Sequence, residues 1–348
     1  MKKVLIGVSG GVDSSVAALL LKKQGYEVAG VTFKLWGDKT SANERDIQDA
    51  KKVCEALGIK HFVFDYKELF KNEVIDYFVS EYKKGRTPNP CIICNKKIKF
   101  EAFLNSALEM GYDYIATGHY AFTKYNKETK RYELIQAKSD KKDQSYVLYS
   151  LTQEQLSHTL FPLGEYSKEQ VRQIAADNNL LVSNKPDSQD ICFIPDGNYE
   201  NFLLNYTGEK CPEGNFKDVK GNIIGKHLGL WHYTIGQRKG LGMAFGKPMF
   251  VMDISPEDNS VTLADDNEIF SDTLYTEKAN LIAIDNLTEP IKLTAKIRYS
   301  HPKAKATLYP MENGELKVIF DEPQRAVTKG QAIVFYDGAS VFGGAIIK

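Results

Sequence analysis

The spacing of apolar and polar positions changes along the chain, and the change separates a part with strands and helices from a part with strands alone. In the first half, short apolar runs such as Val4–Val8, Val28–Leu35 and His61–Asp65 are separated by segments with helical spacing. Two of these segments, Ser14–Lys23 and Glu44–Leu57, are followed within two residues by a glycine, which is common just after a helix. Strands separated by helices predict βαβ units and a parallel sheet.

The same pattern continues for about a hundred residues more. Asn72–Lys83 has helical spacing, and "YDYIATGH", residues 112–119, reads as a strand that leads into a loop. Lys168–Asn179 is the last clear helical pattern before a loop that holds Cys192. Ligands of parallel sheets lie beyond the carboxyl ends of the strands, so we expect the functional site there.

After about Tyr206 the pattern changes to short alternating runs punctuated by Gly and Pro. Examples are "MFVMDI", "SVTLAD", "LTAKIRYS" and "QAIVFY". Such runs are typical of antiparallel sheets or small barrels. The predicted fold class is therefore α/β, with a parallel-sheet domain followed by a small, mainly-β central domain and a C-terminal β-barrel. We expect these three domains to span residues 1–205, 206–275 and 276–348.

The composition excludes some classes of protein. The 43% apolar and 26% charged content of the 348 residues is ordinary for a globular protein. No run of about 18 apolar residues exists, so we expect no membrane span. The N-terminus has no signal-peptide pattern. Because the five cysteines are an odd number, they argue against a disulfide framework. We therefore expect a cytoplasmic protein with some reactive cysteines.

Charge is unevenly distributed although the formal net charge is zero. Three stretches, 82–100, 219–252 and 290–311, carry six, five and five basic residues and no acidic residue. Together they can line one electropositive surface of the kind that binds nucleic acid. Solvated lysines on unrelated faces are the alternative interpretation.

A tight glycine turn, "SGGVDS" at residues 9–14, joins the first predicted strand to the first predicted helix. Its glycines let backbone N–H groups approach phosphate oxygens, and Ser9 and Ser14 add hydroxyl donors at the positive end of the helix. The turn is neither a Walker A loop nor a dinucleotide loop. Asp13 would repel bare phosphate, so we expect a Mg²⁺ ion beside it. The turn resembles the PP-loop of the N-type ATP pyrophosphatases, which holds the pyrophosphate end of ATP.

Three cysteines lie in two further segments of unusual composition. In "GRTPNPCIICNKKIKFEAF" two prolines predict an extended path that presents Cys91 and Cys94 from a loop. Positive charges lower the pKa of a neighbouring thiol. Three lysines follow within a few residues, Lys96, Lys97 and Lys99. Cys192 lies in "SQDICFIPDGNY", about a hundred residues further on.

With these segments, essentially the whole chain is similar to the bacterial tRNA 2-thiouridylases. Seven motifs occur in one order: SGGVDS, TPNPC..CN, GHYA, KDQSY, SQDICF, TIGQRKGLG and IRYSH. The resemblance implies ATP-dependent conversion of the wobble uridine of tRNA, position 34, to 2-thiouridine through an adenylated uridine. It also implies that tRNA, ATP, Mg²⁺ and a sulfur-donor protein or sulfide source take part.

The resemblance further implies roles for individual residues. Cys94 would be the thiol nucleophile and Cys192 the cysteine that carries a persulfide. ATP would be held by Gly7, Val8, Ser9, Gly10, Gly11, Val12, Asp13, Ser14, Phe33 and Gly118. Contacts with tRNA would come from Asn89, Pro90, Cys91, His119, Lys142, Asp143, Gln144, Arg298, Tyr299 and Gln331. His119 has an alternative role as the cap of a loop, and Arg298 and Tyr299 as an exposed pair.

Cys91 departs from the family pattern, because many relatives have at this position an aspartate that is proposed to act as an acid or base. A thiol has a higher intrinsic pKa and does not simply inherit that role. A CxxC pair with one distant cysteine also suits a three-thiolate iron–sulfur or zinc site. We predict a 4Fe-4S cluster held by Cys91, Cys94 and Cys192; the alternative is the persulfide relay, with Cys91 as a spectator or a resolving thiol. Cys54 is expected in the core, since apolar residues surround it in a predicted helix. Cys211 has no assigned role.

Two other functions share parts of this sequence pattern. ATP-dependent amide ligases, such as the NAD and GMP synthetases, have the same glycine turn but need no thiol chemistry. A tRNA-binding module without enzymatic activity would need the basic stretches only.

Overall fold

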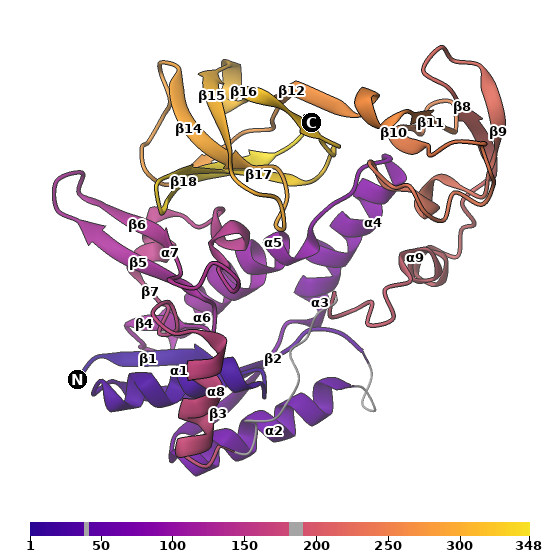
Figure 1. The fold of residues 1–348 in the computed structure, drawn as a ribbon. Coiled ribbons are helices and arrows are strands. Elements are labelled where there is room, and N and C mark those ends of the chain that lie inside the picture. The colour runs from indigo at the N-terminus through magenta and orange to yellow at the C-terminus, as the bar shows by residue number, and fades with distance from the viewer. Residues whose placement is uncertain (38–41, 181–190) are drawn as a thin grey trace.

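The computed structural model describes residues 1–37, 42–180 and 191–348 (Figure 1). Its N-terminal part contains a sheet with the strand order β3-β2-β1-β4-β7. Every neighbouring pair in this sheet is parallel, which confirms the prediction. Its strands are β1 (Lys3–Gly7), β2 (Glu27–Lys34), β3 (Lys60–Asp65), β4 (Tyr114–Ala116) and β7 (Thr159–Leu160).

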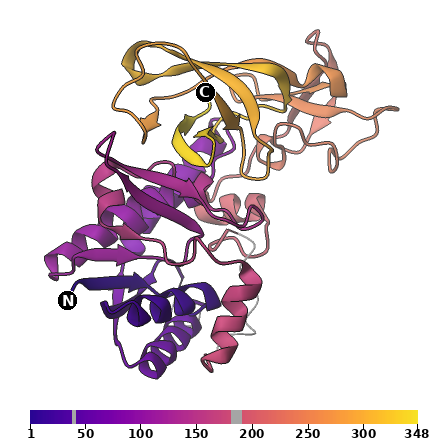
Figure 2. The ribbon, with the colours of Figure 1, turned by 60° about the vertical axis from the view of Figure 1, so that its left-hand side comes forward.

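Helices cover both faces of the parallel sheet (Figures 1 and 2). On one face, Val4 and Ile6 of β1 lie in a core cluster with side chains of three helices, α1 (Val12–Lys23), α2 (Ala42–Leu57) and α8 (Lys168–Asp177). On the other face, Leu5 packs with Phe103 and its neighbours. Because both faces are buried, the strands are continuous apolar runs in the sequence.

Two long helical stretches combine α-helical and π-helical segments. The first consists of α3 (Lys67–Phe70), the π-helical η1 (Lys71–Ile75) and α4 (Asp76–Lys83), so the predicted helix begins earlier than expected. The second consists of α5 (Pro90–Cys94), the π-helical η2 (Asn95–Ala102) and α6 (Phe103–Glu109). Insertions of π-helix are frequent at functional sites.

The prediction that a loop presents Cys91 and Cys94 is wrong, because both residues belong to α5. Residues 86–89 are irregular, as the prolines suggested, but the helix begins at Pro90. The Asn89 side chain accepts a hydrogen bond of 3.1 Å from the N–H group of Cys91 and caps the helix. Proline is favoured in the first turn of a helix, since it has no N–H group to leave unpaired.

A hairpin that the sequence patterns missed connects the N-terminal part to the C-terminal barrel. It consists of β5 (Ala121–Asn126) and β6 (Arg131–Gln136). Strand β6 pairs with β18 (Ser340–Ile346), where Leu134 lies opposite Val341. The sheet of the barrel is therefore continuous with a segment of the first 150 residues.

The remaining strands form the two mainly-β parts that the sequence predicted. The central sheet has the order β10-β11-β8-β9, and the barrel sheet has the order β12-β16-β15-β14-β17-β18-β6-β5, with β13 paired to β18. The bounds are β8 (Gly214–Lys217), β9 (Ile223–His227), β10 (Phe250–Ser255), β11 (Ser260–Ala264), β12 (Phe270–Tyr275), β13 (Asn280–Leu281), β14 (Ile291–Lys296), β15 (Ala304–Pro310), β16 (Leu316–Arg325) and β17 (Ala332–Asp337).

Short helices lie between these strands. One of them, α9 (Tyr199–Thr207), follows the turn of Cys192 and was not expected from the sequence. The others are α7 (Gln153–Ser157) and the 3-10 segments η3 (Ser145–Leu148), η4 (Leu230–His232), η5 (Asp266–Glu268) and η6 (Glu312–Gly314).

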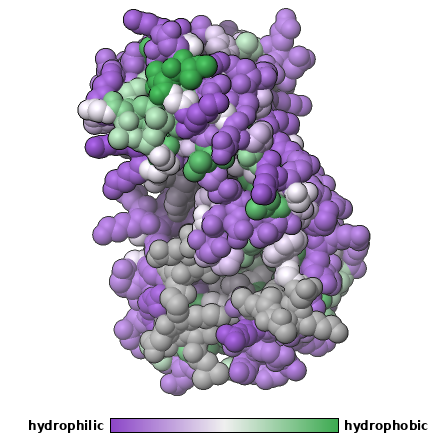
Figure 3. Space-filling view, turned by 90° about the vertical axis from the view of Figure 1, so that its right-hand side faces the viewer, coloured by the Kyte–Doolittle hydropathy of each residue, from purple (hydrophilic) through white to green (hydrophobic). Residues whose placement is uncertain are grey.

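The surface is mostly hydrophilic on the face shown in Figure 3, with small hydrophobic patches in its upper part. Exposed apolar side chains of the central part include Val219, Ile223, Leu228 and Met243. Within the described ranges, no helix has the length and apolar character needed to cross a membrane.

Candidate active site

The glycine turn lies between the carboxyl end of β1 and the N-terminus of α1. Gly11 is the N-cap of this helix, so the capping residue itself has no side chain that could accept from the first N–H groups. Gly10 has a φ of +70°, and a Cβ at this position would lie 2.8 Å from the carbonyl oxygen of Asp46. Ser14 accepts a hydrogen bond of 3.1 Å from the N–H group of Ser9. The turn therefore places backbone N–H groups and hydroxyls at the positive end of a helix, an arrangement that binds anions.

Two predicted ATP residues from other strands border this turn. The ring of Phe33, near the carboxyl end of β2, lies 3.5 Å from where a Cβ on Gly7 would be. A Cβ on Gly118, which follows β4, would lie 2.8 Å from the backbone nitrogen of Ser14. The backbone at Gly118 thus approaches the first turn of α1. The carboxyl ends of three parallel strands bring these residues to one edge of the sheet.

The carboxylate of Asp13 has partners that the sequence did not suggest. Lys168, at the start of α8, donates to both carboxylate oxygens at 2.8 Å, and the Tyr120 hydroxyl donates to one of them at 2.7 Å. Lys168 and Tyr120 are buried. No local pattern marks this ion pair, because 155 residues separate its members. The pair places a cation beside the anion-binding turn.

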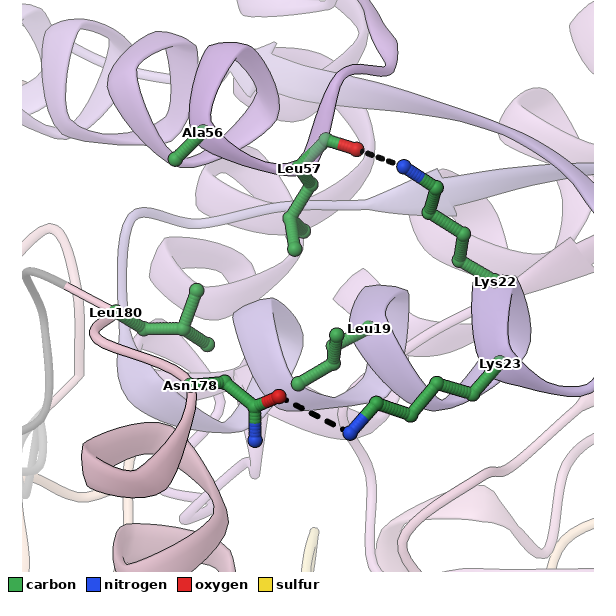
Figure 4. Close-up of a pocket in the computed structure, with 7 residues that line it drawn as sticks. All are labelled: Leu19, Lys22, Lys23, Ala56, Leu57, Asn178 and Leu180. Atoms are coloured by element: carbon green, nitrogen blue, oxygen red, sulfur yellow. Dashed lines mark hydrogen bonds between the residues drawn. The ribbon is translucent and has the colours of Figure 1, made fainter.

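The open pocket in Figure 4, about 420 Å³ in volume, is not this site. It is lined by residues at the C-terminal ends of α1 and α2, including Lys22 and Leu57, and by Asn178 and Leu180. A 12-residue helix is about 18 Å long, so α1 separates the pocket from the glycine turn.

Cys94 and Cys192 are brought together by an apolar cluster. Cys94 is 7% exposed and packs in this cluster beside η1 and α4. Phe193 and Ile194, which follow Cys192 in its turn, belong to the same cluster. The cluster therefore holds the turn of Cys192 against the helix that carries Cys94. The ten residues before Ile191, including the first half of the predicted loop, lie outside the described residues.

The thiols are in an environment opposite to the predicted one. Burial raises the pKa of Cys94 to about 12, and it also raises the pKa of Cys91 and Cys192, although their side chains reach the surface. The positive charge of Lys99 lowers the pKa of each thiol, but by less than burial raises it. The prediction of lowered thiol pKa values is wrong in the net shift, because desolvation of a thiolate outweighs one nearby cation.

Negative charges on the three thiols act on one another, which shows that they are close. Charge on Cys192 and on Cys91 raises the pKa of Cys94 after the larger effect of burial. Yet no group of three or more His, Cys, Asp or Glu side chains could hold a metal ion within residues 1–37, 42–180 and 191–348. A 4Fe-4S cluster binds each thiolate to a different iron, so the three-thiolate site that the sequence suggested stays a prediction.

The other cysteines are outside this group. Cys54 is fully buried among the apolar residues of α1 and α2, which confirms the prediction. Cys211 is half-buried beside the core of the central part. All five cysteines are free thiols.

His119 connects the glycine turn to the cysteine helix. It follows Gly118 directly, and its ring lies 5.8 Å from the ring of Phe100 in η2. It shares a hydrogen bond of 2.8 Å with the Thr117 hydroxyl. Burial and the positive charge of Lys99 hold the pKa of His119 well below its usual range, so the ring is neutral near pH 7. It can exchange hydrogen bonds with a ligand but does not attract phosphate as a cation.

The predicted tRNA residues between β6 and η3 have mixed environments. Asp143 is buried, and its carboxylate accepts hydrogen bonds from the N–H groups of Ala137 and Ser145, the Ser145 hydroxyl and the Gln136 amide. This burial does not agree with a contact between the Asp143 side chain and RNA. The Gln144 side chain accepts a hydrogen bond of 3.0 Å from the N–H group of Tyr120.

The predicted tRNA residues of the barrel lie where it meets the N-terminal part. The Tyr299 hydroxyl donates to the carbonyl oxygen of Asp143 at 3.0 Å, so the structure joins these two segments. Arg298 is half-buried and donates to the carbonyl oxygen of Arg325 at 3.4 Å. Gln331 donates to the carbonyl oxygen of Thr87 at 2.7 Å, next to the start of the cysteine helix.

A parallel sheet with a short glycine turn after its first strand, open at the carboxyl ends, defines a PP-loop nucleotide-binding domain. Comparison with family models agrees with this fold: the tRNA methyl transferase HUP domain matches residues 2–196. The tRNA methyl transferase PRC-barrel domain matches residues 200–265, and the aminomethyltransferase β-barrel domain matches residues 271–347.

The chain belongs to the family of bacterial tRNA-specific 2-thiouridylases. It is 52% identical over 354 residues to the tRNA-specific 2-thiouridylase MnmA of Clostridioides difficile, covering 100% of this chain and 98% of the relative. It is also 52% identical over 356 residues to the protein of the same name from Acetivibrio thermocellus, covering 100% of this chain and 99% of that one.

Solved structures resemble the chain only in part. One is the U34-tRNA thiolase NcsA from Methanococcus maripaludis with its 4Fe-4S cluster, which is 20% identical. It has a TM-score of 0.36 and covers 59% of this chain and 66% of that chain. A likeness of this size carries no argument about a cluster in this protein.

Proposed function

We propose that this protein is a tRNA-uridine 2-sulfurtransferase that uses ATP and Mg²⁺ to thiolate the wobble uridine of tRNA. The proposal rests on a continuous chain of contacts from the anion-binding turn to the cysteines. Gly118 packs on the first turn of α1, His119 packs on Phe100, and Phe100 lies in the same helical stretch as Cys94. A nucleotide on the turn and a sulfur atom on a cysteine would therefore meet on one substrate.

The first step would take place at the glycine turn. The turn and the start of α1 would hold the pyrophosphate end of ATP, while Lys168 adds positive charge beside it. Mg²⁺ would be held chiefly by the phosphates, since the carboxylate of Asp13 already pairs with Lys168. The uridine oxygen O2 would attack the α-phosphorus, and pyrophosphate would leave. The product is an adenylated uridine whose C2 has a good leaving group.

The second step would take place at the cysteines. The terminal sulfur of a Cys192 persulfide would attack C2, and AMP would leave. The Cys94 thiolate would then attack the Cys192 sulfur, releasing 2-thiouridine and leaving a disulfide between the two cysteines. A thiol reductant must supply two electrons before the next turnover. A sulfur-donor protein then reloads the reduced Cys192 thiol by transferring the outer sulfur of its own persulfide. Sulfide would reload Cys192 only by attacking the disulfide before it is reduced, which forms the Cys192 persulfide and frees the Cys94 thiol.

The buried thiol of Cys94 suits this order of events. A thiol with a pKa of about 12 stays protonated and unreactive in the free protein, which limits oxidation and side reactions. Backbone N–H groups of Cys192 and Phe193 point to the Cys192 sulfur, and they lower the pKa of this thiol against the larger effect of burial. Cys192 is thus the better site for a sulfur carrier that must be loaded from outside.

Two chemistries named above are less consistent with this site. Methyl transfer, after which the matching domain families are named, requires neither an ATP-binding turn nor paired cysteines. An amide ligase would need the turn but not the thiols. We propose cytoplasmic action, where free thiols stay reduced.

The test is anaerobic incubation with tRNA, ATP and a sulfur source, followed by mass spectrometry of nucleosides. We expect 2-thiouridine, one AMP and one pyrophosphate per thiolation. If the wild type forms AMP and pyrophosphate but no 2-thiouridine, and the Cys94→Ser variant forms AMP and pyrophosphate at the same rate, an amide ligase is favoured instead.

The same preparation separates the thiol relay from an iron–sulfur cluster. Reconstitution with iron and sulfide should leave the protein colourless and active, since we propose a relay. Broad visible absorption with about four irons per chain, lost together with activity in Cys91→Ser, would show a cluster instead.

A further inference from the structure

The segment that leads into the cysteine helix, residues 84–90, is where all three parts of the chain meet. Its backbone pairs with the β16–β17 loop of the barrel: the N–H group of Thr87 donates to the carbonyl oxygen of Lys329 at 2.9 Å. The carbonyl oxygen of Thr87 accepts from the Gln331 side chain at 2.7 Å. Thr87 is therefore held on both sides by the barrel, four residues before Cys91.

Ion pairs of Arg86, the residue before Thr87, also hold this segment in place. The guanidinium of Arg86 lies 2.9 Å from Glu81 of α4 and 2.7 Å from Glu277 of the barrel. It also donates to the carbonyl oxygen of Ile347, at 3.1 Å. The side chains of Glu81 and Arg86 are only 5% and 19% exposed, so water weakens this contact little.

The fit of the barrel against the segment is close. Gly330 has a φ of +88°, and a Cβ there would lie 3.0 Å from both the Cβ of Arg86 and the nitrogen of Thr87. The central part makes a similar approach, since a Cβ on Gly85 would lie 3.0 Å from Pro256. The backbone of the segment is therefore in close contact with the barrel at Gly330 and with the central part at Gly85.

From Thr87 the path to the cysteines is short and stiff. Pro88 and Pro90 restrict the backbone, Asn89 caps α5, and Cys91 lies in the first turn of that helix. A displacement of the barrel loop would therefore reach the cysteine helix with little loss.

We propose that the C-terminal barrel, through Gln331 and Arg86, fixes the position of the cysteine helix, so that the barrel is a positioning element for sulfur transfer. Gln331 then acts on the cysteine helix through Thr87, a role beyond the tRNA contact that the sequence resemblance implied. Movement of the barrel when tRNA binds is transmitted to Cys94. The catalytic consequence rests on the proposed function, but the mechanical coupling does not.

The test compares two glutamines of the barrel in the full-length protein without tRNA. Gln331→Met removes the hydrogen bond to Thr87, and the matched control Gln324→Met removes a hydrogen bond of the same 2.7 Å length, from Gln324 to Glu322 within β16. Iodoacetamide labelling with peptide-resolved mass spectrometry measures the exposure of Cys94. We expect Gln331→Met to accelerate the labelling of Cys94 about fivefold and Gln324→Met to leave it unchanged.

A second pair of variants tests the close approach. Gly330→Ala places a Cβ against Arg86, whereas Gly338→Ala introduces the same kind of backbone strain, at a φ of +57°, with no atom within 4 Å. Only Gly330→Ala should change the labelling of Cys94. Thermal unfolding of all four variants shows whether any change reflects general loss of stability.

Three outcomes would overturn the proposal. Unchanged Cys94 labelling in Gln331→Met and Gly330→Ala would exclude the coupling. Equal acceleration in the control variants would indicate general loosening. Weaker tRNA binding by Gln331→Met with unchanged labelling would show that Gln331 is an RNA contact.

If the wild type thiolates tRNA, kcat of Gln331→Met should fall about fivefold with KM for tRNA within about twofold. If it does not, the proposed function fails while the labelling still decides the coupling.

Discussion

The glycine turn and the cysteine helix lie at the same edge of the parallel sheet but are built in different ways. The turn uses consecutive residues, 9–14, and its donors are mostly backbone groups at a helix end. The cysteine region combines a helix, a turn about a hundred residues later and a loop of the barrel. The anion site depends on local conformation, whereas the thiol site depends on packing between distant segments.

The two regions also differ in electrostatics. The turn is a positive helix end with a buried lysine beside it, which suits a ligand that is already charged when it binds. The thiols lie in a partly desolvated environment that opposes charge until a substrate arrives. On the proposed function, the charged nucleotide and the thiol nucleophile therefore use opposite environments within one chain.

The largest expected effect separates the two regions completely. Cys94→Ser should reduce 2-thiouridine formation to background, about 10³-fold or more, because a hydroxyl does not cleave a persulfide. ATP-dependent adenylation should continue, since the glycine turn is intact. Nucleoside mass spectrometry and pyrophosphate release measure the two steps separately.

The control for this variant is Cys211→Ser, which alters a half-buried thiol outside the cysteine group. It should retain wild-type thiolation. Equal loss of adenylation and thiolation in Cys94→Ser would mean that the two regions do not act separately.

At the ion pair of the glycine turn, an equally large effect is expected for Asp13 and a smaller one for Lys168. Asp13→Ala should abolish thiolation while tRNA binding stays within about twofold, because the carboxylate serves the nucleotide and not the RNA. Lys168→Met should lower adenylation about 10²-fold, since it removes a positive charge beside the phosphates. Both are measured by pyrophosphate release and by tRNA titration.

The matched control is Lys138→Met, which breaks an ion pair with Glu165 whose two side chains are 66% and 64% exposed. Exposed pairs contribute little, so activity should change less than about twofold. If Lys168→Met no longer bound tRNA tightly, the assignment of this lysine to the nucleotide would be contradicted.

The anion site could be predicted from the sequence because its signals are contiguous. A strand, a glycine turn and a helix follow one another, and the parallel sheet places Gly118 beside them without further information. The start of α5 was missed although a local signal existed, since Asn89 followed by Pro90 is a favourable N-cap and first turn. The prolines were interpreted only as breakers of regular structure.

Other features have no local signal at all. Lys168 begins α8 after an ordinary capping box, and nothing near it indicates that its amine reaches Asp13. The pKa values of the thiols depend on apolar residues such as Phe193 that fold over them from another segment. Neighbouring lysines are visible in the sequence, but desolvation is not, so the sign of the pKa shift was predicted wrongly.

A moderate effect is expected for Lys99, whose charge lowers the pKa of all three thiols. Burial raises the pKa of Cys94 to about 12, so its thiolate fraction, and its alkylation rate, should rise about tenfold per pH unit from pH 7 to pH 9. Lys99→Met removes a charge that lowers this pKa, and it should slow alkylation about threefold at any pH in this range. The control is Lys96→Met, which changes an exposed lysine of the same segment.

A plateau in the alkylation rate below pH 9 would contradict this prediction. It would mean that Cys94 has an ordinary thiol pKa. The environment of the cysteine helix would then accept a negative charge, as that of the glycine turn does.

The smallest expected effect concerns tRNA binding by the basic stretches outside both regions. Arg298→Ala and Lys239→Ala should each weaken binding several-fold and lower the slope of log affinity against log salt by about one, the value for one lost phosphate contact. Lys239 is exposed, whereas Arg298 is half-buried, so the Arg298→Ala variant needs a check of thermal stability.

Lys60→Ala is the matched control, because Lys60 is exposed at the amino end of β3, opposite the edge that carries both sites. If all three variants have the wild-type slope, the acid-free stretches are solvated surface, and tRNA must be held by residues close to the glycine turn and the cysteine helix themselves.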